Sequence, residues 1–74
     1  MISFNQAVIA AIKDCNAFGG VVDVEETLTK IMTLCVTLPG SNMDIHDRMS
    51  TLQKFGGWHN TVDALNDLKI ELAS

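Results

Sequence analysis

The two halves of this 74-residue chain repeat one pattern at an offset of 37 residues. In each half an apolar stretch ends in Phe-Gly-Gly, and a second apolar stretch follows the glycines. Because glycine tolerates the positive φ found at helix C-termini, each glycine pair predicts a turn between two helices. Either an ancient duplication of one half or independent convergence of both halves on the same helical hairpin would produce this pattern. The corresponding positions include Gly19-Gly20 with Gly56-Gly57, Val8 with Ile45, Ile12 with Met49, Leu28 with Leu65, and Ile31 with Leu68.

Apolar residues on both sides of each glycine pair recur every three or four positions, which is typical of amphipathic helices. Ser3 with Gln6 has the form of a capping box, and Asp23 with Glu26 resembles a second helix start. We predict an all-α fold, a four-helix bundle of two αα-hairpins, with helices over about 4–18, 23–38, 42–55 and 60–73. The helices form a single domain, 1–74, with pseudo-repeat halves 1–38 and 39–74.

The four predicted helices differ in how much of their circumference is apolar. The helix over 23–38 has an apolar arc of roughly 200°, wider than the stripe of a helix that packs on one side. We therefore expect it at the centre of the bundle, or with one flank in an interface. The helix over 42–55 has a narrower stripe and should lie at the periphery. That stripe consists of Ile45, Met49, Leu52 and Phe55.

The charge balance of the chain is acidic, with nine Asp and Glu against five Lys and Arg, and a formal net charge of -4. Since nucleic-acid binding depends on clustered basic residues that neutralise phosphates, the scattered cations exclude direct binding to DNA or RNA. An acidic surface fits either a basic protein partner or simple solubility. No apolar run approaches the about 20 residues that span a bilayer. We expect no membrane contact and a cytoplasmic location.

The two cysteines, Cys15 and Cys35, each lie inside an apolar helical stretch, and no Cys-x-x-Cys or Cys/His ligand spacing is present. We interpret them as buried small hydrophobic residues. The chain shows no secretory signal pattern, so free thiols in a reducing compartment are expected. A Cys15–Cys35 bridge is the alternative, because antiparallel helices bring such positions close together.

No set of residues has the pattern of a catalytic, cofactor or metal site. Nucleophilic catalysis needs a Cys or Ser beside a base that a third group orients, but the cysteines are expected to be buried and most of the serines to be caps or surface residues. The glycine pairs lack the lysine and strand context of a phosphate loop. His46 and His59 have no converging ligands nearby and are expected to be solvated. The sequence predicts a protein that is not an enzyme and needs no cofactor.

One twelve-residue segment, 14–25, resembles the calcium-binding loop of an EF-hand. The resemblance implies a calcium site with ligands from Asp14, Asn16 and Glu25, at loop positions 1, 3 and 12, and Gly19 at position 6. It departs from the pattern at Phe18 and Val22, which offer no side-chain oxygen. The corresponding segment of the second half has almost no carboxylates. A divergent EF-hand-like protein is therefore an alternative hypothesis.

Several apolar residues lie outside the predicted core stripes. Our first hypothesis is a small acidic protein–protein interaction module, a regulator or inhibitor of a basic host protein of the bacterial or phage type, by analogy of composition. A structural subunit of a homo-oligomer, with a dimer as the simplest form, is the further alternative. The residues expected to bind the partner are the single tryptophan, Trp58, and Ile70, Met32, Val36 and Ile9.

Overall fold

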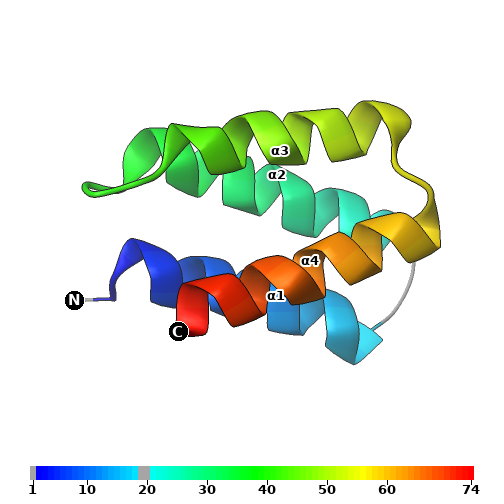
Figure 1. Cartoon of the computed structure of the whole chain (residues 1–74), viewed down its shortest axis with the longest axis horizontal. Helices are drawn as coiled ribbons and strands as arrows, with labels where there is room; N and C mark the ends of the chain where they lie inside the picture. Colours follow the sequence, from blue (N-terminus) through cyan, green and yellow to red (C-terminus); the bar gives the residue numbers. More distant parts are fainter. Residues whose placement is uncertain (1, 19–20) are drawn as a thin grey trace.

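The computed structural model describes the backbone of residues 2–18 and 21–74, and the side chains of 2–15 and 23–74. The described chain contains four α-helices and no strands: α1 (Phe4–Phe18), α2 (Val21–Thr37), α3 (Met43–Phe55) and α4 (Trp58–Ala73) (Figure 1). The predicted all-α fold is confirmed. Two of its starts also match the sequence signals. The Ser3 and Gln6 side chains each accept a hydrogen bond from the other's backbone N–H at 3.2 Å, and Asn42 Oδ1 accepts one from the Asp44 N–H at 2.9 Å.

Helices α2 and α4 begin two residues earlier than predicted. The polar residues at their predicted starts, Asp23 and Asn60, lie inside the first turn. A carboxylate there is stabilised by the helix dipole without acting as a cap. In α4 the N-cap is Gly57, in extended conformation with φ -81° and ψ 168°, and it makes no side-chain cap hydrogen bond. Helix α2 also ends one residue earlier than predicted, at Thr37.

The helices pack in the order α3–α2–α1–α4. Helix α2 contacts all three others, α1 packs on α2 and α4, and α3 packs mainly on α2. Helices α3 and α4 are consecutive in sequence but make few contacts with each other. Both chain ends lie at the same end of the bundle as the α2–α3 connection, and the α3–α4 connection lies at the opposite end (Figure 1). The central position predicted for the second helix and the peripheral one predicted for the third are both found.

One apolar core joins all four helices. It includes Val8 and Ile12 of α1 and Leu65 and Leu68 of α4, all fully buried. The prediction that Phe55 belongs to the inward stripe of α3 is wrong, because its side chain is 82 % exposed. At about 100° per residue, position 55 is rotated roughly 80° away from Ile45, on the side opposite to Met49, which turns it out of the core-facing stripe. The other buried core residues are Phe4, Ala11, Cys15, Val24, Leu28, Ile31, Cys35, Ile45 and Met49.

The two glycines between α3 and α4 have different surroundings, so replacing each of them by serine should have different effects on stability. A Cβ on Gly56 would lie 2.7 Å from Thr61 Oγ1 and 2.8 Å from the Leu52 carbonyl oxygen, whereas a Cβ on Gly57 meets nothing within 4 Å. We expect Gly56→Ser to lower the free energy of unfolding by about 1 to 3 kcal/mol through overpacking. Gly57→Ser should raise it by a few tenths of a kcal/mol, because serine at an N-cap accepts a backbone hydrogen bond.

Urea denaturation followed by circular dichroism measures both variants against the wild type. Equal effects of the two substitutions would contradict the packing described here.

Candidate functional site: the groove between α1 and α2

The five residues expected to bind a partner do not form one patch. Met32 and Trp58 are half-buried and pack against the core, and Ile9 is half-buried on α1. Val36 and Ile70 are 64 % and 66 % exposed. Ile70 points about 180° away from Thr61, which is buried in α4, and Val36 points outward from α2. Since α2 and α4 face each other across the core, the two exposed side chains lie on opposite sides of the bundle.

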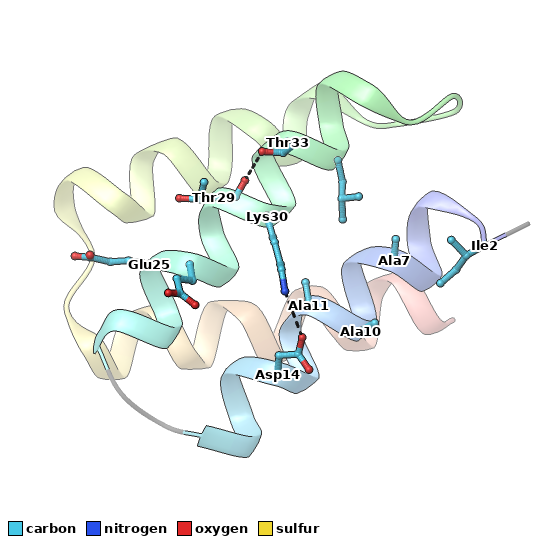
Figure 2. Close-up of a pocket in the computed structure, with 11 residues that line it drawn as sticks. Ile2, Ala7, Ala10, Ala11, Asp14, Glu25, Thr29, Lys30 and Thr33 are labelled. Atoms are coloured by element: carbon cyan, nitrogen blue, oxygen red, sulfur yellow. Dashed lines mark hydrogen bonds and ion pairs between the residues drawn. The ribbon is translucent and has the colours of Figure 1, made fainter.

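A groove of about 800 Å³ runs along the outer face between α1 and α2. We call it the α1–α2 groove. Its α1 wall consists of Ala7, Ala10 and Ala11, and Ile2 lies at the end near the chain termini (Figure 2). Alanine has the smallest side chain with a Cβ, so this wall lets a second helix approach closely. The groove is therefore shallow, open and mostly apolar.

The α2 wall is formed by Thr29, Thr33 and Leu34. The Thr33 hydroxyl donates to the Thr29 carbonyl oxygen at 2.9 Å, and the Thr29 hydroxyl oxygen accepts a hydrogen bond from Gln53 Nε2 of α3 at 3.3 Å. Both hydroxyl groups therefore have a hydrogen-bond partner within the protein. This wall therefore tolerates an apolar neighbour in spite of its polar composition.

Charge is distributed very unevenly along the groove. Residues 1–12 and 31–43 contain no Asp, Glu, Lys or Arg. The lining residues from these segments form the half of the groove near the chain termini: Ile2, Ala7, Ala10, Ala11, Thr33 and Leu34. The other half has three carboxylates, Asp14, Glu25 and Glu26, against the single ammonium of Lys30. The groove thus changes along its length from uncharged to acidic.

Lys30 crosses from α2 toward α1 near the point where the two halves meet (Figure 2). Its Nζ lies 3.8 Å from Asp14 Oδ2, and the side chains are 67 % and 62 % exposed. An ion pair this long and this exposed contributes little, about 0 to 1 kcal/mol before screening by salt. Asp14 is therefore held by a contact that another cation can readily replace.

This groove was missed by the sequence analysis, because its walls are alanine and threonine instead of large apolar residues. The signal that indicates it is the absence of charge from 1–12 and 31–43, which antiparallel pairing of the first two helices brings together. Phe55 was missed as an exposed aromatic side chain because the sequence analysis placed it in the core. It lies at the opposite end of the bundle from the uncharged half of the groove.

A smaller groove of about 390 Å³ separates α3 from α4 and is lined by residues that include Met49, Leu52 and Ala64. Arg48, which also lines it, reaches across to α4, where its Nη1 donates to Glu71 Oε2 at 3.2 Å. This ion pair joins two helices that otherwise make few contacts with each other. The α3–α4 groove is thus half the size of the α1–α2 groove and is bridged by a charged pair.

The residues of the EF-hand-like segment lie in two helices. Asp14 and Asn16 belong to α1, Glu25 belongs to α2, and residues 19–20, with Gly19, lie outside the described residues. An EF-hand site needs these ligands on one continuous loop that wraps around the ion. Within the described part of the chain, no three His, Cys, Asp or Glu side chains are grouped as metal ligands. Asp14 is instead paired with Lys30.

The two histidines are in different environments. His46 is half-buried, with Nδ1 3.7 Å from Asp47 Oδ1, and His59 is exposed in the first turn of α4. His46 is thus less solvated than predicted. Neither histidine lines the α1–α2 groove.

Cys15 and Cys35 are free thiols in the core, almost fully shielded from solvent. Burial raises the pKa of both, and the nearby Asp23 carboxylate raises that of Cys15 further, while a hydrogen bond with the His46 backbone opposes the rise at Cys35. A raised pKa means that the reactive thiolate is disfavoured in the folded state. The cysteines are therefore structural and poorly nucleophilic.

Comparison with known proteins adds no family: no family model matches the chain, and no curated protein or solved structure is significantly similar to it. In the described part of the chain no helix combines the length and apolarity required to span a bilayer.

The raised thiol pKa values predict how stability depends on pH. The unfolded chain, with ordinary thiols, loses protons first as the pH rises, so this contribution to stability is complete below the ordinary thiol pKa and declines above it. We expect the free energy of unfolding to fall between pH 8 and pH 10, and to fall less in a Cys15→Ala/Cys35→Ala variant. Urea titrations at the two pH values measure this difference. An identical decline in both proteins would show that other groups cause it.

Proposed function

We propose that this protein is a non-enzymatic protein–protein interaction module that binds its partner through the α1–α2 groove. The observation that carries the proposal is the change along the groove from an uncharged, alanine-walled half to an acidic half. Interface centres are depleted of charge, and polar or charged residues surround them. The groove has an uncharged part and, at one end of it, a charged part.

The composition of the chain supports a basic partner. The groove has three carboxylates against one ammonium, and the whole chain has a formal net charge of -4. An acidic surface accelerates association with a basic protein and selects against acidic ones. Regulation or inhibition of a basic host protein in the cytoplasm, in a bacterial or phage setting, is the concrete form of this function.

The interaction surface differs from the one expected from the sequence. None of the five residues first expected to bind a partner lines the groove. Trp58 and Met32 support the core. The proposed site therefore excludes these five residues and gives the main role to the alanine wall of α1.

Substitution of an exposed wall alanine tests the proposal. Ala10→Arg places a long charged side chain in the uncharged half of the groove, and Ala73→Arg makes the same change at an exposed site on α4. In affinity capture from the native host, a partner that binds the groove should be retained by the wild type and Ala73→Arg and reduced at least about tenfold with Ala10→Arg. A partner lost equally with both variants, or with neither, would contradict the proposed site.

Salt dependence tests the electrostatic part separately. Binding of the captured partner should weaken as the salt concentration rises from about 50 to 500 mM, since the screening length for exposed charges falls from about 14 Å to about 4 Å over this range. Titration of the purified pair at several salt concentrations measures it. Affinity that does not change with salt would exclude a basic partner bound at the acidic half.

A further inference from the structure

The dimensions of the α1–α2 groove fit a single helix. On α2 the lining extends from Glu25 to Leu34, which corresponds to about 14 Å at 1.5 Å per residue, or two and a half helical turns. The walls are two antiparallel helices, and between them lie the small side chains Ala7, Ala10 and Ala11. A third helix packs into such a depression by placing its side chains between the two ridges.

We propose that the occupant of the groove is an amphipathic helix of the partner, with small or apolar residues over about one and a half turns and Lys or Arg over the next turn. The inference rests on the proposed function and specifies its partner. The apolar part lies along Ala7, Ala10 and Leu34, and the basic part lies at Asp14 and Glu26. The polarity of the groove thus fixes which end of the groove the basic part of the helix occupies.

The basic residues of the partner helix compete with Lys30 for Asp14. Lys30 contacts Asp14 at 3.8 Å from a solvent-exposed position, so exchange for an incoming guanidinium or ammonium loses little. An arginine can bind a carboxylate with two parallel hydrogen bonds, which a lysine cannot. Arg in the partner should therefore displace Lys30 more effectively than Lys.

A second copy of this chain fits the groove less well. Its five basic residues, Lys13, Lys30, Arg48, Lys54 and Lys69, are at least six positions apart, so no segment presents two cations on adjacent turns of one helix face. Two copies also bring together two chains of formal net charge -4. Charge complementarity therefore favours a different, basic chain over self-association.

Synthetic peptides of about 16 residues test the inference with the intact protein. The first peptide has Leu and Ala on one helix face, followed on the same face by Arg; its sequence is also made in reverse order to allow for either direction. The second has the same composition with the Arg residues on the opposite face, and the third has Glu in place of Arg. We expect one of the two sequence orders of the first peptide to bind about tenfold more tightly than the second peptide. The third peptide should not bind. Fluorescence anisotropy of labelled peptides measures the affinities.

Matched variants locate the bound peptide. Glu26→Lys should weaken binding of the first peptide about tenfold, whereas Asp67→Lys, the same charge change on α4 outside the groove, should have much less effect. Lys30→Met, which removes the competing cation, should strengthen binding about threefold. Circular dichroism melts confirm that each variant is folded. Equal weakening by Glu26→Lys and Asp67→Lys, or equal binding of the Arg and Glu peptides, would overturn the inference.

The outcomes distinguish this inference from the proposed function. If no peptide binds while a captured partner still depends on Ala10, the groove is an interaction site and its occupant is not a basic helix. If, in addition, the partner does not depend on Ala10, the proposed function fails as well. Sedimentation at several concentrations completes the test, because a wild-type dimer that Ala10→Arg converts to a monomer would show a second copy in the groove and overturn the basic-helix inference.

Discussion

Burial of the inward face of α2 is the interaction on which the rest of this structure depends. Its side chains Leu28, Ile31 and Cys35 are almost completely buried, and α2 contacts all three other helices. In a domain this small a single core supplies only a few kcal/mol of net stability. The wide apolar arc of α2 increases the buried apolar surface, because it lets one helix pack against three neighbours. Its outward side is then the one that remains free for the groove with α1.

Core and groove use different residue types for different physical reasons. The core is filled with large aliphatic side chains, whose burial removes the most apolar surface from water. The groove walls are mostly alanine and threonine. These side chains bury less apolar surface than the core residues do, but they leave room for another chain. The same two helices therefore hold the bundle together on one side and leave a depression on the other. Charge varies in a different direction, along the length of the helix pair. The acidic residues lie at one end of the groove, and the other end has no charged residue.

The features that depend on local periodicity could be predicted from the sequence. Those that depend on how the helices are rotated and paired could not. The helix number, the capping box at Ser3 and the central place of α2 follow from local spacing and apolar content. The exposure of Phe55 depends on a rotation of about 80° around α3, which a count of apolar residues does not reveal. The start of α4 at Trp58 was missed because Asn60 is a better cap by type than Gly57. The groove was missed because an absence of charge in two distant segments has meaning only once the segments are paired.

The order of packing, α3–α2–α1–α4, makes the two halves of the chain unequal. Helices α1 and α2 form a hairpin whose members contact each other closely, while α3 and α4 each find their main partner in the first half. The two halves thus repeat the same sequence pattern, but only the first half forms a hairpin whose two helices pack on each other. A folding pathway that begins with α3–α4 pairing has little native contact to gain, whereas pairing of α2 with its sequence neighbours α1 or α3 gains far more.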